Sequence, residues 1–62
     1  MKVREALLDE RINNNTMVII KNMYGVTAVC GRWYQDKILV CGHYDVSFDF
    51  DAERNIAVLQ LV

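Results

Sequence analysis

The sequence has few of the residues on which most enzymes depend: its 62 residues include one serine, one histidine, two cysteines and three glycines. A Ser-His-Asp triad would have to combine Ser47 with His43 in an exposed sheet, and we give it no weight. A glycine-rich phosphate loop is absent because Gly25, Gly31 and Gly42 stand apart from one another. We therefore expect no enzyme, no catalytic residues and no cofactor.

A basic cluster and a long hydrophobic run are also lacking. The net charge is −1 and the seven basic residues are spread along the chain, whereas binding to nucleic-acid phosphates needs a basic face. Apolar runs such as Met17–Ile20 and Ile38–Cys41 have four residues, too few to span a bilayer. The first ten residues lack the apolar core of a signal peptide. We expect a cytoplasmic protein with no nucleic-acid and no membrane partner.

Soft metal ligands are limited to Cys30, Cys41 and His43. Structural zinc usually takes four ligands with short spacing, and Asp45 would have to complete this set. We favour two reduced thiols and an ordinary histidine, and expect no metal. A metal- or ligand-binding domain built on the three residues remains the alternative function. A nucleophilic Cys41 is a third hypothesis, disfavoured because so small a domain offers little cleft to exclude water.

What the chain does have is apolar side chains, which make up 53% of its residues. Its length allows one domain, residues 1–62. A domain of this size buries a smaller fraction of its surface than a larger one. Apolar side chains are therefore left over for a partner, and self-association is one form that the contact can take.

The first third of the chain predicts a helix. Residues Val3–Ile12 contain good helix formers and neither Gly nor Pro. Val3 pairs with Leu7, and Leu8 pairs with Ile12, at the four-residue spacing of one helix face. The asparagines of Asn13–Asn15 favour the end of the helix, because Asn tolerates left-handed backbone.

The remainder predicts strands and turns. We expect strands at Thr16–Lys21, Val26–Gly31, Val46–Phe50 and Ile56–Val62, the last apolar on both faces apart from Gln60. Residues 37–41 are compatible with a strand or with a helical turn. The expected fold class is α+β, with one N-terminal helix packed on a small antiparallel sheet of three to five strands. One short helix covers one face, so the other is solvated, covered by residues 32–44 or paired with another protomer.

Two groups of residues are candidates for a binding surface. Aromatic side chains and arginine dominate protein interfaces, and this chain offers Tyr24, Arg32, Trp33, Tyr34 and Tyr44. The same rings are equally suited to packing a thin core. Alternation in the third strand places Val46, Phe48 and Phe50 on one face, and an acidic row on the other consists of Asp45, Asp49 and Asp51. That row can bind a basic partner or simply keep the sheet soluble.

Several short motifs resemble a known group of proteins. Residues Val3–Leu8, then Asn15–Thr16 leading into Val18–Ile20, and the closing aliphatic run Ile56–Val62 resemble short uncharacterised proteins encoded by phages and mobile elements of Gram-positive bacteria. The resemblance implies a bacterial or phage cytoplasmic origin and a small α+β fold. It implies no established activity.

The sequence thus predicts a non-enzymatic protein-interaction module, in which homodimerisation is one possibility. We expect Arg32, Trp33 and Tyr34 to anchor a protein partner, and the acidic row to orient it.

Overall fold

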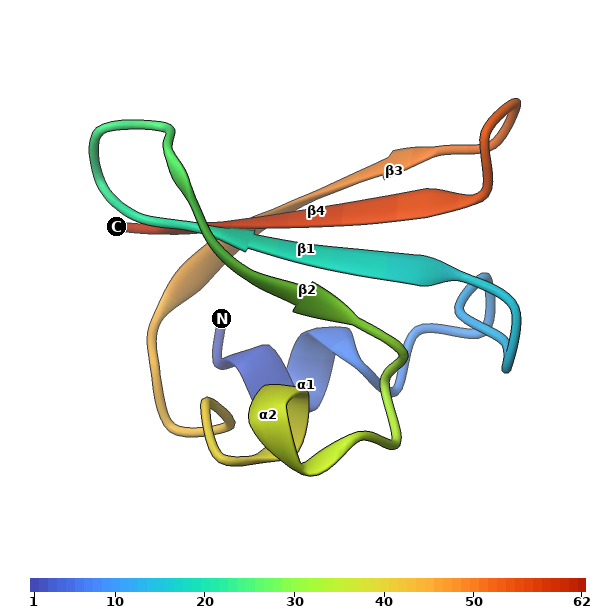
Figure 1. Cartoon of the computed structure of the whole chain (residues 1–62), viewed down its shortest axis with the longest axis horizontal. Coiled ribbons are helices and arrows are strands. Elements are labelled where there is room, and N and C mark those ends of the chain that lie inside the picture. The colour runs from blue at the N-terminus through green and yellow to red at the C-terminus, as the bar shows by residue number, and fades with distance from the viewer.

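Six short elements follow one another along the chain, and the computed structural model describes all 62 residues (Figure 1). In chain order they are α1 (Val3–Ala6), β1 (Met17–Lys21), β2 (Thr27–Gly31), α2 (Asp36–Leu39), β3 (Val46–Asp51) and β4 (Ile56–Leu61). The four strands agree with the predicted ranges to within one residue at each end. The two hairpin turns use residues that tolerate positive φ, Gly25 (φ 79°) and Asn55 (φ 55°).

The strands form one mixed sheet in the order β2-β1-β4-β3. The hairpins β1–β2 and β3–β4 are antiparallel, but β1 and β4 run parallel in the centre, with Met17 opposite Ile56. The prediction of a purely antiparallel sheet is therefore wrong. The most apolar strands occupy the centre, where each has a neighbour on both sides, and parallel pairing there requires the long crossover that α2 supplies.

Helix α1 ends at Ala6, six residues short of the predicted end at Ile12. Beyond it the chain tightens into turns, in which the N–H of Leu8 bonds Glu5 and the N–H of Asp9 bonds Ala6. The Asp9 carboxylate then accepts a hydrogen bond from the Arg11 N–H at 3.0 Å, a local bond that competes with helix. Leu8, expected on the buried stripe, is 84% exposed.

The ambiguous segment resolves as a helix, so the fold has two helices and not one. Helix α2 lies between β2 and β3 and buries a single side chain, Ile38. The helix connects the β1–β2 hairpin to the β3–β4 hairpin. Because it crosses the inner face, it brings the second hairpin to the other side of β1, where β4 pairs with β1.

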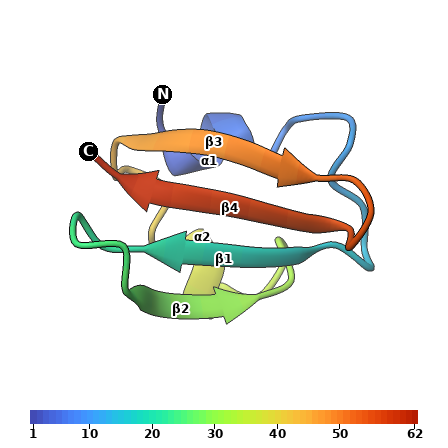
Figure 2. The ribbon, with the colours of Figure 1, turned by 90° about the horizontal axis from the view of Figure 1, so that it is seen from above.

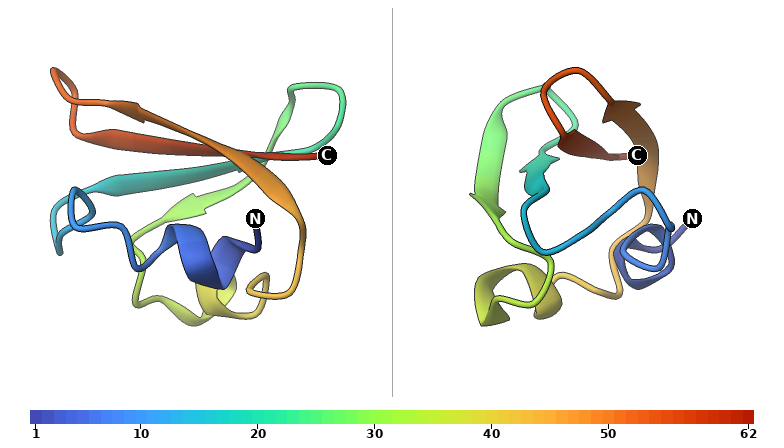
Figure 3. Two further views of the ribbon diagram at one scale, coloured as in Figure 1. Left: turned by 180° about the vertical axis from the view of Figure 1, so that it is seen from behind. Right: turned by 90° about the vertical axis from the view of Figure 1, so that its right-hand side faces the viewer.

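Both helices pack on the same face of the sheet, which we call the inner face (Figures 1 and 3). The core between them consists of Val3, Ala6, Val18, Ile20, Ile38, Val46, Ala57 and Leu59. The predicted alternation of β3 is confirmed, because Phe48 and Phe50 pack against this core while Asp49 is exposed. The guanidinium of Arg11 lies over both rings, at 5.2 and 5.3 Å from their centroids.

One polar side chain, Thr16, is fully buried, and no sequence pattern marks it as such. The hydroxyl of Thr16 donates to Asn55 Oδ1 at 2.7 Å and accepts from the N–H of Asn13 at 3.0 Å. Burying a hydroxyl costs free energy unless such partners exist. The asparagine segment is thereby joined to the β3–β4 turn.

Candidate interaction surface

The five residues predicted to form an interface do not form one cluster. Tyr24 lies in the β1–β2 turn and is 87% exposed. Trp33 and Tyr34 follow the far end of β2, so the whole strand separates them from Tyr24. Tyr44 precedes β3 and contacts His43, with 4.4 Å between ring centroids. The aromatic side chains thus occupy three separate places on the molecule.

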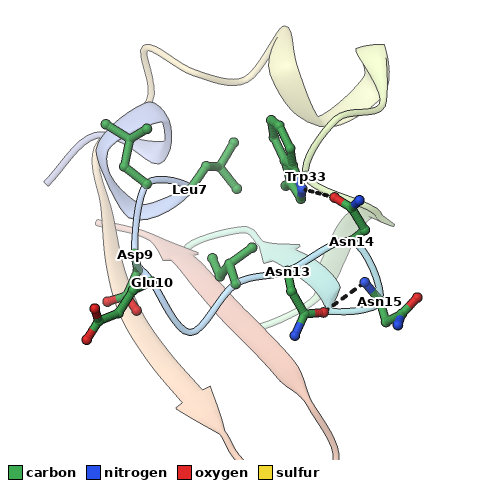
Figure 4. A pocket seen from close by; sticks show the side chains of 9 residues that line it. Leu7, Asp9, Glu10, Asn13, Asn14, Asn15 and Trp33 are labelled. Carbon is green, nitrogen blue, oxygen red and sulfur yellow. Dashed lines mark hydrogen bonds between the residues drawn. The ribbon is translucent and has the colours of Figure 1, made fainter.

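Trp33 forms one wall of an open groove of about 590 Å³. The other lining residues belong to the segment after α1, from Leu7 to Asn15 (Figure 4). The indole Nε1 donates a hydrogen bond to Asn14 Oδ1 at 3.1 Å. Tyr34 packs edge-on against the indole at 5.8 Å. Trp33 therefore joins the β2–α2 loop to the asparagine segment.

Most polar groups of this groove already have partners within the fold. Asp9 forms an ion pair with Arg11 at 2.9 Å, and Asn13 Oδ1 accepts from the N–H of Asn15 at 2.8 Å. Asn14 Oδ1 accepts from the indole. A ligand would have to displace these bonds. The groove is thus better explained as a junction between two loops than as a binding site.

The Asp9–Arg11 pair gives the groove a measurable titration. Hydrogen bonds from the Arg11 guanidinium, and then from its backbone N–H, lower the pKa of the Asp9 carboxyl from 3.8 to about 2. Because the pKa is lowered in the folded state, the stabilisation is complete above the ordinary value and is lost as pH falls through about 2. We expect Arg11→Gln to raise the Asp9 pKa toward 3.8, measured by NMR titration of the carboxyl carbon.

The control for this titration is Arg4→Gln, which removes a cation from α1 without touching Asp9. We expect it to leave the Asp9 titration unchanged. A wild-type midpoint near the ordinary value would contradict the observed ion-pair geometry.

The structure does not bring Cys30, Cys41 and His43 together. Cys30 is exposed on β2, whereas Cys41 follows α2 and packs against the core on the inner face. The Cys41 thiol donates to the Lys37 carbonyl at 3.5 Å, and His43 lies against Tyr44. No group of three or more His, Cys, Asp or Glu side chains is placed to hold a metal ion.

The predicted acidic row lies on the outward side of β3, but two of its members have partners. Asp45 forms an ion pair with Lys2 at 3.1 Å. Asp51 accepts hydrogen bonds from the N–H groups of Glu53 and Arg54 in the β3–β4 turn. Asp49 has neither a hydrogen bond nor an ion pair. It is thus the member of the row that is free to contact another molecule.

The side of the sheet opposite the helices, which we call the outer face, is covered by no helix or loop. Figure 2 looks onto this face, and the four strands lie in front of everything else. The two middle strands present six partly exposed side chains on this face: the apolar Met17, Ile19, Ile56 and Val58, and the polar Lys21 and Gln60. Sequence reasoning left this face open, and the apolar character of the last strand on both faces was the available signal.

The side chains of the outer face lie in rows that run across the strands from β2 to β3. The register places Cys30, Ile19, Val58 and Asp49 in one row from β2 to β3. In the next row Met17, Ile56 and Asp51 face one another, and the guanidinium of Arg32 lies 3.6 Å from the Met17 sulfur. The third outward row is polar and consists of Thr27, Lys21, Gln60 and Ser47. The face therefore has one cation, Arg32, beside the end of β2, an acidic edge at β3, and between them an apolar group bordered by Lys21 and Gln60.

Neither α1 nor α2 is long and apolar enough to cross a membrane. The comparisons with known proteins found no matching family model, no matching curated protein and no matching solved structure.

Proposed function

We propose that this chain is a non-enzymatic protein-interaction module that binds its partner through the outer face of the sheet. One observation supports the proposal above all: the two most apolar strands lie in the middle of a face that nothing covers. Sheets with one solvated face normally alternate polar residues outward. Here Ile19 and Val58 point outward from neighbouring strands, in register with each other.

The magnitude of this surface fits reversible binding. The four apolar side chains are already largely buried within the chain, so completing the burial of each contributes about 0.5 kcal/mol, and of all four about 2 kcal/mol. Association itself costs several kcal/mol in lost translational and rotational freedom. Charged contacts at the two edges would then have to provide orientation and part of the affinity.

Of the three residues expected from the sequence to anchor a partner, namely Arg32, Trp33 and Tyr34, we retain Arg32. It lies beside the end of β2, where its guanidinium contacts Met17. Trp33 engages Asn14, outside this face, so we assign it to the fold rather than to the partner. The phage or mobile-element origin and the cytoplasmic location remain predictions.

The test compares binding by the wild-type protein and by a double variant, Ile19→Thr with Val58→Thr. Threonine keeps the β-branched shape that strands prefer but makes the outer face polar. With the protein immobilised, we expect the double variant to lose at least ~10-fold in the amount of protein captured, either from a bacterial extract or as a second copy of this chain, because ~1.4 kcal/mol of binding free energy is tenfold in affinity.

The matched control is Tyr24→Ser, which removes a more exposed hydrophobic side chain from the β1–β2 turn. We expect the control to bind as the wild type does. Equal binding by the double variant, or equal loss in the control, would show that the outer face is not the binding surface.

A further inference from the structure

We propose that the occupant of the outer face is a second copy of this chain, related to the first by a two-fold axis parallel to the strands. The inference rests on the proposed function, because it names the partner of the same surface. Its basis is the order of side chains across the sheet. The register gives three outward rows: Cys30, Ile19, Val58 and Asp49; Met17, Ile56 and Asp51, with Arg32 beside Met17; and Thr27, Lys21, Gln60 and Ser47.

The axis runs parallel to the strands in the space between the two facing sheets, above the line where β1 and β4 meet. Rotation about it reverses the order of the strands in the second copy. The β2 edge of one copy then faces the β3 edge of the other. Ile19 of one copy meets Val58 of the other, and Met17 meets Ile56, because these pairs share a row. The apolar centre is therefore complementary to itself.

The same operation also pairs opposite charges. Arg32 contacts Met17, whose row ends at Asp51, so Arg32 of one copy lies over Asp51 of the other and one row away from Asp49. The contact occurs twice, once at each edge, as it must in a two-fold dimer. Asp49, which forms no ion pair within the chain, faces Cys30 of the other copy and lies in the row next to its Arg32.

The other in-plane two-fold axis, perpendicular to the strands, does not fit the charges. It would stack β3 on β3 and place Asp49 of one copy against Asp49 of the other. Like charges facing each other across an interface disfavour association. A partner with a different sequence could also cover the face, but only a second copy is guaranteed to present the reversed order of charges.

The size of the face predicts a weak dimer. Four strands ~4.8 Å apart and about five residues long give a patch of ~19 by ~17 Å. That is ~320 Å² in projection, well below the ~800 Å² per partner of a standard interface. We therefore expect reversible dimerisation that depends on concentration.

The experiment is a charge exchange followed by sedimentation equilibrium at low salt, from micromolar to near-millimolar protein. We expect Arg32→Asp alone, and Asp49→Arg alone, each to raise the dissociation constant at least ~10-fold, because each places like charges together at both edges. An equal mixture of the two variants restores opposite charges at both edges of a heterodimer. We expect the mixture to associate within ~3-fold of the wild type.

Asp49 is the residue chosen for exchange because Asp51 also closes the β3–β4 turn. Arg4→Asp makes the same change in net charge on α1, away from the outer face, and we expect wild-type association. A monomeric wild type at every concentration, or a mixture that associates no better than its components, would overturn the two-fold arrangement.

A second measurement needs no substitution. Cys30 is exposed on the outer face, whereas Cys41 packs against the core on the inner face. We expect thiol labelling of Cys30 to slow as protein concentration rises, while labelling of Cys41 stays constant. If labelling of Cys30 does not change while the protein dimerises, the dimer uses another surface and the inference fails.

These results are distinguishable from failure of the proposed function. A monomeric protein whose capture from extract is still abolished by the outer-face double variant would refute the second copy and retain the interaction surface. A monomeric protein whose capture from extract is also unaffected by the double variant would refute both the dimer and the proposed interaction surface.

Discussion

Replacing Leu59 by alanine is expected to lower the free energy of unfolding by about 2–5 kcal/mol, as is typical of buried leucine truncations. Leu59 is 0% exposed and points to the inner face from the central strand β4. It lies opposite Ile20 on β1 and Phe48 on β3. A domain of this length has a total stability of about 3–9 kcal/mol, so the substitution is expected to remove a large part of it.

The measurement is urea denaturation followed by circular dichroism, at a concentration where the protein is monomeric. The matched control is Val58→Thr, the preceding residue on the same strand, which points to the outer face. We expect this control to cost less than about 1 kcal/mol, because its hydroxyl can be solvated there. Equal losses in the two variants would mean that both faces are buried in the monomer, contrary to the structure.

Replacing Ile38 by alanine is expected to have an effect of similar size, about 2–5 kcal/mol. Ile38 is 0% exposed and is the only side chain that α2 buries. A helix of four residues has no stability of its own in water. Its packing, and with it the crossover that connects the hairpins, therefore depends on this one side chain.

Leu39→Ala is the control, because the neighbouring side chain is exposed. We expect it to change the free energy of unfolding by less than about 0.5 kcal/mol. Hydrogen exchange adds a local measurement: in Ile38→Ala, the amides of Val40 and Cys41, which bond to carbonyls within α2, should exchange faster than those of β1. Unchanged protection of these amides would show that other contacts hold α2 in place.

Local features of the fold were predictable from sequence. The strand β3 alternates apolar and polar residues, and this period of two can be recognised within six neighbouring residues. The turns at Gly25 and Asn55 follow from the backbone freedom of these residues. The end of α1 was not predictable, since it depends on Asp9 bonding Arg11 rather than continuing the helix.

Non-local features came only with the tertiary structure. Aromatic residue types indicate a capacity for binding, but not where each ring lies, so Tyr24 and Trp33 appeared as one group in the sequence and are a strand's length apart in the fold. Cys30 and Cys41 likewise separate onto different sides of the sheet. The ordered charges of the outer face involve Arg32 and Asp49, whose relation depends on the register of three strand pairs.

The ranges of four strands, the α+β class of a small domain and the excess of apolar side chains could all be predicted from the order of the residues. The parallel pairing of β1 with β4, and with it the set of apolar side chains on the outer face, could be read only from the folded molecule. The physical reason is that hairpin pairing is set by neighbouring residues and a short turn. The pairing of the first strand with the last depends instead on burial of both central strands and on the packing of Ile38.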